Sequence, residues 1–431
     1  MILSSVATLF VLVPILSWLS GRNPITTYDT HDDPRNQRPE LQLELRHVHA
    51  VLPSTAHVLF SDVSPQARKA LSNAEDPFSS TKSSYTVRSR PGRTYRPSSF
   101  AAYSRARLRS IQFGENEPLK WDEDEILSPD VDSLETLREL AKMTNNAYVD
   151  PEDPAWYDLN GNWNVSLPFG WEPDADGFRG HVFATPDNNT VVISIKGTSA
   201  GLFGGGGPTA KKDKLNDNLL FSCCCARVDW TWTTVCDCYR GGWKCDQTCL
   251  EDALITESLY YPIGTNLYNN VSYMFPNANI WMIGHSLGGA LSSLVGVTFG
   301  VPVVTFEAPG ERLAASRLHL PSPPSTHHVT HVYHTADPIP MGTCNGVLSS
   351  CALGGYAMET ACHLGKSIIF DTVTNASWTV DIRTHGIVNV IERLLAEPWP
   401  PSVEIGREVP EAKPEDDCVE CYSWNFGDFP S

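Results

Sequence analysis

Residues 280–294, IWMIGHSLGGALSSL, leave this chain few ways to fold. Four apolar residues lead into Gly-His-Ser-Leu-Gly, and small residues that suit a close-packed helix follow at once. A buried strand that turns sharply into a helix explains this order, because Gly284 and Gly288 lack the side chains that would clash inside the turn. Such a turn lifts the serine hydroxyl out of the sheet at a helix N-terminus, where negative charge is favoured. The run therefore predicts a nucleophile elbow with Ser286 at its tip.

The bare pattern Gly-x-Ser-x-Gly is less specific than its surroundings. At ordinary glycine usage, a chain like this contains the pattern about 0.2 times by chance. The alternative interpretation is a serine that merely begins a helix. The apolar strand before the pattern and the helix after it favour the catalytic interpretation, so Ser286 is the candidate nucleophile.

A serine hydroxyl needs a base, and the base needs an acid to orient it. In a sheet with this elbow the chain order is serine, acid, histidine. The run HVTHVYHTADPIP places Asp337 directly after a predicted strand and before Pro338, which ends the strand. Asp371 is the weaker candidate. We therefore predict Asp337 as the acid.

Two histidines follow Asp337 in the sequence. His385 stands at a predicted loop-to-helix boundary, whereas His363 is next to Cys362, which we expect to be held in a disulfide. His385 is thus the predicted base. His285 precedes the nucleophile, and we expect its side chain to point away from the triad and to serve packing or hydrogen bonding.

The tetrahedral intermediate that such a serine nucleophile forms also needs two donors for its oxyanion. The backbone N–H of Leu287, next after the nucleophile, is one candidate. The second is Thr198, through its backbone and hydroxyl, because VVISIKGTS ends an apolar strand at Gly-Thr. The alternative there is an ordinary strand-ending turn.

Strand-like and helix-like runs alternate through most of the chain, which predicts an α/β fold with a mainly parallel sheet. The predicted strands are 180–185, 190–197, 279–283, 302–307 and 328–335, and the predicted helices are 132–149, 247–273, 386–397 and one that begins at Leu287. A Gly-rich and Cys-rich insertion, about 200–249, interrupts the alternation.

The N-terminal region differs from the rest. Residues 2–19 are uncharged, apolar and about long enough to span a bilayer, and we favour an uncleaved signal anchor over a cleaved signal peptide because SWLSG is a poor cleavage site. Residues 21–125 are predicted to form a partly disordered lumenal stem. Within it, residues 82–109 are rich in Ser, Pro and Arg and contain no acidic residue; they suit a solvated connector, or alternatively a contact with anionic phospholipids.

Cysteines and glycosylation sequons place the chain in the secretory pathway. The 12 cysteines favour disulfides, and the irregular spacing of their pairs makes zinc the less favoured alternative. Four sequons begin at Asn164, Asn188, Asn270 and Asn375.

A group of histidines lies close together in the sequence, at His327, His328, His331 and His334. Alternation along a strand separates their side chains onto two faces, so we predict no metal site. The net charge of -18 argues against nucleic acid as a partner.

Several longer strings resemble one known family. Four strings are similar to the class 3 (fungal triacylglycerol) lipases: SIKGTS, GHSLGGALSSL, TADPIP and RTHGI. Four others are similar to the fungal vacuolar lipases that break down autophagic bodies: AKMTNNAY, CCCARVDWTW, FEAPGERLA and ACHLGKSIIFDTV. The resemblance covers about residues 125–425 and implies an α/β-hydrolase domain over 126–425, after an anchor at 1–20 and the stem. It implies Ser286, Asp337 and His385 as the triad, with Thr198 and Leu287 at the oxyanion hole, and no cofactor. In place of the lid helix of the secreted lipases stands GLFGGGGPTAKKDKLNDNLLFSCCC, which leaves the lid position open.

The function implied is that of a membrane-anchored serine lipase. By resemblance its substrates are triacylglycerol and the phospholipids of vesicle membranes, and it is a single-pass glycoprotein with a lumenal catalytic domain, delivered through multivesicular bodies to the vacuole. Two alternatives remain: a carboxylesterase for small soluble esters, and a non-catalytic lipid-binding protein on a hydrolase fold.

Overall fold

A computed structural model describes residues 38–51, 57–63, 85–148, 177–198, 210–227, 234–258, 260–346 and 349–429. The chain divides into two units, Met1–Gln37 and Arg38–Ser431, and the second contains all the described residues. The predicted anchor at 2–19 and the sequon at Asn164 lie outside the described residues. Within the described part, every helix is too short or too polar to cross a membrane.

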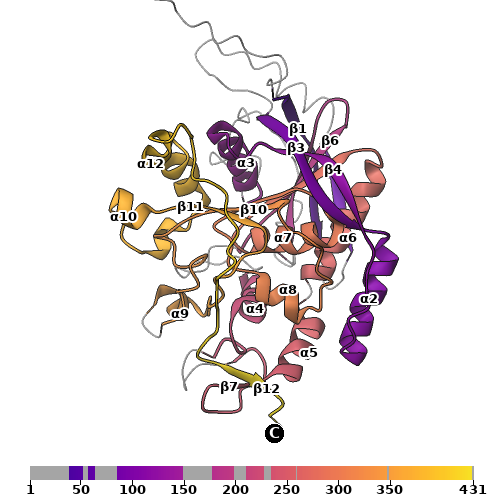
Figure 1. Ribbon diagram of the computed structural model, residues 1–431, viewed down its shortest axis with the longest axis vertical. Coiled ribbons are helices and arrows are strands. Elements are labelled where there is room, and N and C mark those ends of the chain that lie inside the picture. The colour runs from indigo at the N-terminus through magenta and orange to yellow at the C-terminus, as the bar shows by residue number, and fades with distance from the viewer. Residues whose placement is uncertain are drawn as a thin grey trace, which may run out of the picture. The chain divides into compact units, whose positions relative to one another are not determined.

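A ten-stranded sheet forms the centre of the second unit, and one half of it is parallel (Figure 1). The parallel strands, in spatial order, are β11 (Lys366–Phe370), β10 (Val329–His334), β9 (Val303–Phe306), β8 (Asn279–His285) and β6 (Thr190–Ile195). These are short, Val- and Ile-rich runs buried almost throughout, as expected for parallel strands covered by helices on both faces. The predicted α/β class is confirmed, and the parallel arrangement holds for the strands that carry the candidate site.

The other half of the sheet is antiparallel, and most of it comes from the segment predicted to be a stem. It consists of β5 (Arg179–Ala184), β1 (Glu40–Val51), β2 (Val58–Asp62), β3 (Tyr85–Pro97) and β4 (Trp121–Pro129). β1 pairs with β5 and so joins the central sheet directly. The predicted boundary at 125–126 is therefore wrong for the described residues from Arg38 onward, which belong to the same unit as the hydrolase elements.

Charge pairing explains why the basic run at 82–109 is ordered from Tyr85 onward. β3 supplies the basic side chains, and the adjacent β4 has the acidic sequence WDEDEILSP. Arg93 lies 3.5 Å from Glu123, and Arg96 lies 3.3 Å from Asp124. The acidic partners come about 30 residues later, and the interpretation of this run as a solvated connector is wrong for β3, which is paired in the sheet. The alternative, a contact with anionic phospholipids, stays a prediction. The run then continues as helix α2 (Phe100–Phe113).

Helices cover both faces of the parallel strands and form two apolar cores. Alternation along β8 divides its side chains, with Trp281 and Ile283 in one core and Ile280 and Met282 in the other. The first core is completed by α3 (Leu134–Asn146) and by the segment of α11 (Ile387–Asn389) and the π-helical turn Val390–Leu394. The second core includes residues of α4 (Ala210–Phe221), α5 (Gln247–Glu257), α6 (Tyr260–Met274), α7 (Leu287–Phe299) and α8 (Arg312–Arg317).

Two predicted helices differ from those observed. The helix predicted over 247–273 is divided into α5 and α6, with Ser258 at the end of α5. The helix predicted over 386–397 is only three residues of α-helix before the π-helical turn. The predicted helix near 132–149 is present as α3, whose N-terminal cap is Ser133, as its position before an apolar periodic run indicates.

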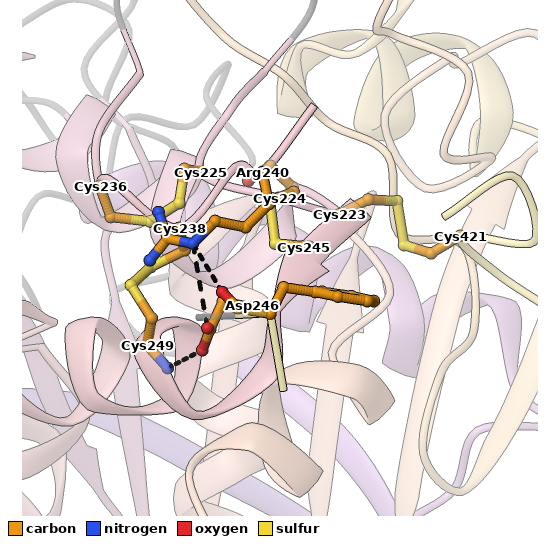
Figure 2. The surroundings of a disulfide bond; sticks show 12 residues. Cys223, Cys224, Cys225, Cys236, Cys238, Arg240, Cys245, Asp246, Cys249 and Cys421 are labelled. Atoms are coloured by element: carbon orange, nitrogen blue, oxygen red, sulfur yellow. Dashed lines mark hydrogen bonds and ion pairs between the residues drawn. A yellow bond between two sulfur atoms is a disulfide. The ribbon is translucent and has the colours of Figure 1, made fainter. Parts of the chain in front are cut away.

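The cysteine-rich region consists of residues 222–227 and 234–249 together with the C-terminal segment 418–429. It contains two three-residue strands, β7 (Lys244–Asp246) and β12 (Asn425–Gly427), which pair in parallel. All twelve cysteines are in disulfides, which confirms the predicted oxidised state and removes the thiolate zinc alternative. The pairs are Cys223–Cys421, Cys224–Cys245, Cys225–Cys236, Cys238–Cys249, Cys344–Cys351 and Cys362–Cys418, and Figure 2 shows the first four close together.

Candidate active site

Ser286 lies at the turn between β8 and α7 in a strained conformation. Its φ is 56° and its ψ is −131°, a region that residues with a side chain rarely adopt. A Cβ on Gly284 would lie 2.3 Å from the carbonyl oxygen of Gly288, and a Cβ on Gly288 would lie 2.3 Å from that of Ile195. The structure thus has the strand, turn and helix predicted for a nucleophile elbow, and both glycines are required by close backbone contacts.

Three predicted residues form one hydrogen-bonded row. Ser286 Oγ is 2.9 Å from His385 Nε2, and His385 Nδ1 is 2.6 Å from Asp337 Oδ2. The three residues come from three separate elements: the β8–α7 turn, the loop after β10, and the boundary between the 3-10 turn η2 (Ile382–Thr384) and α11. A base placed between a hydroxyl and a carboxylate in this way can take up the hydroxyl proton while the carboxylate fixes its ring orientation.

Asp337 is fully buried and is held as an acceptor. Its Oδ1 accepts a hydrogen bond from the N–H of Ile339 at 3.0 Å, which fixes the carboxylate plane beside His385. Burial alone raises the pKa of such a carboxyl, but the charge and the hydrogen bond of His385 outweigh it and hold the pKa of Asp337 below its usual value. The group opposite Ser286 therefore stays ionised, as the acid of a triad requires.

Glu307 is a second buried carboxyl behind the triad, and the sequence analysis did not identify it. It follows β9 with a φ of 45°, it is 0% exposed, and its Oε2 accepts a hydrogen bond from the N–H of His334 at 3.4 Å. Burial, followed by the charge of Asp337, raises the pKa of Glu307 well above its usual value, which favours a neutral carboxyl next to Asp337. Its proximity to Asp337 depends on the parallel pairing of β9 with β10, which short-range sequence patterns do not specify.

His285 was expected to point away from the triad, and this is wrong. Its ring centroid lies 4.6 Å from that of His385. The expected hydrogen-bonding role is present, because Nε2 lies 2.8 Å from the carbonyl oxygen of His385 and Nδ1 lies 2.7 Å from the hydroxyl of Tyr148. Burial, together with the nearby His385, lowers the pKa of His285 to about 3, so its ring stays neutral and supports the backbone of the base.

The two predicted oxyanion donors lie at the same site. Leu287 is the first residue of α7, so its N–H has no partner within the helix. Thr198 follows β6, and its Oγ1 lies 2.5 Å from Asp217 Oδ2 of α4. When Asp217 is ionised, the hydroxyl of Thr198 donates to it and has no proton left for an oxyanion.

The protonation state of Asp217 therefore controls this donor. Burial raises the pKa of Asp217 to about 8. Below that pH the carboxyl is protonated and can donate to Thr198 Oγ1, which frees the threonine proton for a substrate oxygen. The sequence analysis identified Thr198 and missed Asp217, because α4 reaches the turn only through the tertiary fold.

A cavity of about 280 Å³ gives access to Ser286. Ser286, His385 and Thr198 are on its wall, and much of the remaining surface is apolar. The apolar lining residues include Ile339, Met358, Ile382, Ile387 and Val388. Val388 is 47% exposed, and Leu353, in α9 (Ser350–Gly354) next to the lining residue Cys351, is 80% exposed. Of the segment in which a lid was sought, 201–225, residues 201–209 lie outside the described residues, and most of the remainder forms α4.

The alternative triad residues have other roles. Asp371 caps the short helix α10 (Thr372–Ala376), where its side chain accepts from the N–H of Thr374. His363 Nδ1 lies 3.0 Å from Glu415 Oε1, and its Nε2 lies 3.0 Å from the carbonyl oxygen of Ala308. Neither residue contacts Ser286 or His385, so the structure favours Asp337 and His385.

The histidines of β10 are separated onto two faces, as alternation predicts. His331 Nδ1 is bonded to Thr305, whereas His334 faces Thr372 and the carbonyl of Thr384. His331 lies in one cluster with Glu311 and His363 whose ligand atoms are within 4.8 Å of one another. Both ring nitrogens of His363 already have protein partners, so this cluster is explained as a buried polar network.

Comparisons with known proteins point to one family. A protein of Cryptococcus neoformans var. neoformans serotype D (strain B-3501A), described as "Putative lipase ATG15", is 53% identical over 367 residues, which are 72% of this chain and 70% of that protein. A protein of Mycosarcoma maydis with the same description is 44% identical over 397 residues, 80% of this chain and 76% of the relative. No family model matches the chain.

Among solved structures, the Lip2 lipase of Yarrowia lipolytica is similar at 16% identity with a TM-score of 0.30, covering 56% of this chain and 80% of that one. The lipase structure from Rhizomucor miehei is similar at 14% identity with a TM-score of 0.26, covering 55% of this chain and 79% of that one.

Proposed function

The chain belongs to the ATG15 lipase family and is an ester hydrolase, and we propose that it acts as a serine lipase on the glycerolipids of membranes, with Ser286 as its nucleophile. The observation that carries the proposal is the position of Ser286 Oγ, which is bonded to His385 Nε2 at the wall of a cavity with a largely apolar surface. Such a cavity can accept an acyl chain with its ester carbonyl beside the hydroxyl.

The reaction follows from the contacts of the three residues. Ser286 Oγ attacks the ester carbonyl carbon while His385 Nε2 takes the hydroxyl proton, and the carbonyl oxygen becomes an oxyanion. When the tetrahedral intermediate collapses, the bond to the glycerol oxygen breaks and His385 gives that oxygen its proton. A water molecule then attacks the acyl-enzyme, again with His385 as the base, and the fatty acid leaves. Asp337 stays ionised throughout and stabilises the charged imidazolium ring.

The oxyanion is stabilised by two donors at fixed positions. The N–H of Leu287 lies at the positive end of α7, and the hydroxyl of Thr198 can donate when Asp217 is protonated. Because these donors are held by the elbow and by α4 before substrate binds, they need little reorganisation in the transition state.

Lipid esters are favoured over small soluble esters by the surroundings of the cavity. The exposed side chains of Val388 and Leu353 provide apolar surface next to its lining, which a lipid surface can cover and a soluble ester does not need. A carboxylesterase for soluble esters is the alternative.

We further propose that the apolar run at 2–19 anchors the enzyme and that its substrates are triacylglycerol and the phospholipids of intravacuolar vesicles, including autophagic bodies. The sequence of this run, six disulfides and sequons at exposed Asn188 and Asn375 are consistent with a lumenal glycoprotein. The family resemblance supports delivery to the vacuole through multivesicular bodies.

The deciding experiment measures hydrolysis of phospholipid vesicles, triacylglycerol emulsions and short-chain soluble esters by the full chain and its Ser286→Ala variant. We expect hydrolysis of the lipid substrates to exceed that of the soluble ester, and the variant to lose at least a thousandfold in kcat on all three. Ser316→Ala, an exposed serine of α8, is the matched control and should retain activity. Lipid hydrolysis that survives in Ser286→Ala contradicts the proposed nucleophile, and activity confined to soluble esters supports the carboxylesterase.

A further inference from the structure

A second cavity, of about 560 Å³, lies behind the wall of the first. Ile339 and Met358 line the catalytic cavity, whereas Met341 and Glu359 of the same two chain segments line the second. The segments are paired by an antiparallel bridge between Cys344 and Met358. Because Met358 and Glu359 are consecutive, their Cα atoms are about 3.8 Å apart, so the two cavities are separated by little more than one chain segment.

The disulfide Cys223–Cys421 forms part of the second cavity and fixes the cysteine-rich region beside it (Figure 2). The tip of this region presents Trp243, which lines the cavity and is 56% exposed. Its φ is 61°, an outlying conformation for a bulky residue, and it follows two glycines that also have positive φ. A strained backbone that exposes a large aromatic ring is unfavourable for the folded chain alone, which points to a role in binding.

Aromatic rings and charges of both signs share this cavity. The ring of Trp243 meets that of Trp424 edge to face with centroids 5.2 Å apart, and Tyr422, 87% exposed, extends the aromatic surface. Arg227 supplies a guanidinium, whose carbon lies 4.7 Å from the centre of the Tyr239 ring. Aromatic faces that meet carboxylates form the usual environment of an organic ammonium group in proteins.

Two partly buried carboxyls complete the lining. Glu359 Oε2 accepts from the N–H of Cys223 at 2.6 Å, and Glu420 Oε2 accepts from the N–H groups of Ala361 and Cys362. Burial raises the pKa of both, that of Glu359 to about 7, so the protein alone disfavours their ionised forms and a cationic group in the cavity would favour them. The charge of the buried Arg317 acts on both carboxyls from behind, and Arg312 also acts on Glu420.

We propose that the second cavity binds the zwitterionic head group of a phospholipid, with the ammonium group between Trp243, Tyr422 and the two carboxyls and the phosphate toward Arg227. This proposal rests on the proposed lipase function and specifies the lipid class presented to the same active site. A purely anionic ligand would meet Glu359 and Glu420, and a purely cationic ligand would meet Arg227. A ligand that carries both charges satisfies both ends of the cavity.

The first test measures binding of phosphocholine, choline and inorganic phosphate to the full chain by calorimetry. We expect phosphocholine to bind at least tenfold more tightly than either choline or phosphate alone, because only phosphocholine contacts both ends. The variant Trp243→Ala should weaken phosphocholine binding about tenfold, and Trp243→Phe should restore most of it. Equal binding of phosphate and phosphocholine, or no binding of phosphocholine, overturns the proposal.

The second test measures hydrolysis of phosphatidylcholine vesicles and of phosphatidylglycerol vesicles, whose head group has no ammonium. For Trp243→Ala and Tyr422→Ala we expect the apparent KM for phosphatidylcholine vesicles to rise about tenfold at unchanged kcat, with little change for phosphatidylglycerol. Tyr273→Ala is the matched control, because Tyr273 is 85% exposed and lines neither cavity. An equal loss on both vesicle types overturns the proposal and identifies the rings as unspecific membrane contacts.

Failure of this proposal is distinguishable from failure of the lipase function. If Ser286→Ala abolishes the hydrolysis of vesicles and Trp243→Ala leaves it unchanged, only the head-group site is contradicted. Phosphocholine binding in a chain that hydrolyses only soluble esters contradicts only the lipase proposal.

Discussion

The five parallel strands contain no cysteine, and side chains such as Val192, Trp281 and Ile283 are fully buried between helices. The cysteine-rich region has two strands of three residues and takes part in five of the six disulfides. A region with little regular structure gains less from hydrogen-bonded ladders and apolar burial, so covalent links must limit its unfolded states instead. The catalytic residues are thus positioned by close packing, and the second cavity is positioned by disulfides.

The largest expected effect concerns the longest covalent link. Replacing both Cys223 and Cys421 with Ser removes a bond that spans 198 residues, and loop-closure entropy predicts a loss of about 5 kcal/mol in the free energy of unfolding. Replacing Cys225 and Cys236, which are 11 residues apart, should cost about 3 kcal/mol. Urea unfolding without reductant measures both. Equal losses from the two replacements would show that the stabilisation by a disulfide in this region does not depend on the length of the loop that it closes.

Close packing at the elbow is tested by Gly284→Ala. The added Cβ would lie 2.3 Å from a backbone oxygen, so the turn must shift, and we expect a loss of about 4 kcal/mol in stability and at least a hundredfold in kcat. Gly346→Ala is the control, because its Cβ would meet nothing within 4 Å. Thermal unfolding and ester hydrolysis measure the two effects. An active and stable Gly284→Ala variant would show that the elbow can accommodate a methyl group that its close packing is expected to exclude.

A buried carboxyl in the second cavity predicts a pH effect on stability. The pKa of Glu359 is about 7 in the folded chain and about 4.5 when exposed, so the unfolded chain binds fewer protons between these values and stability falls as pH rises through that window. Glu359→Gln removes this loss. The free energy of unfolding of the variant, relative to that of the natural chain, should therefore rise by about 3 kcal/mol from pH 4 to pH 8. Denaturant unfolding at both values measures the gain, with exposed Glu404→Gln as the control. If the variant differs from the natural chain by the same free energy at pH 4 and at pH 8, Glu359 remains ionised across this range.

In the catalytic half, Asp217 predicts a pH effect on rate. Ionisation of Asp217 above about pH 8 draws the hydroxyl proton of Thr198 away from the oxyanion, so we expect kcat to fall about tenfold above that pH. The amide of Asp217→Asn donates to Thr198 at every pH and should remove the fall. The pH profile of kcat on a soluble ester compares the two chains. A fall that persists in Asp217→Asn would place its cause elsewhere.

The smallest effect is expected at Glu307. Burial and the charge of Asp337 keep Glu307 neutral, and ionisation at high pH would bring two negative charges together behind His385. Glu307→Gln retains a donor without the charge, so we expect kcat/KM to stay within about threefold at pH 6 and its alkaline limit to move to higher pH. The measurement is the pH profile of kcat/KM for both chains. An identical alkaline limit contradicts the proposed contact.

The elbow, Asp337 and His385 could be predicted because each is next to a local signal: a strand–glycine pattern, a strand-ending proline and a loop-to-helix boundary. Glu307, Tyr148 and Asp217 lack such signals, since each reaches the site through strand pairing or helix placement. Of the antiparallel strands, β5 is predicted by its sequence, whereas β1, β2, β3 and β4 are missed for a related reason. The arginines of β3 are neutralised by β4 only after the chain returns, so each strand alone has the polar composition of a solvated segment.

The link between Cys223 and Cys421 also has a consequence for biosynthesis. Cys224 and Cys225 find partners only 21 and 11 residues further along the chain, so their bonds can form soon after these residues are translated. Cys223, their immediate neighbour, can form its bond only after a further 198 residues have been translated. A product truncated before residue 421 exposes this thiol, and a thiol-reactive chaperone can retain it. Formation of the Cys223–Cys421 bond thus requires that the chain has been made as far as residue 421.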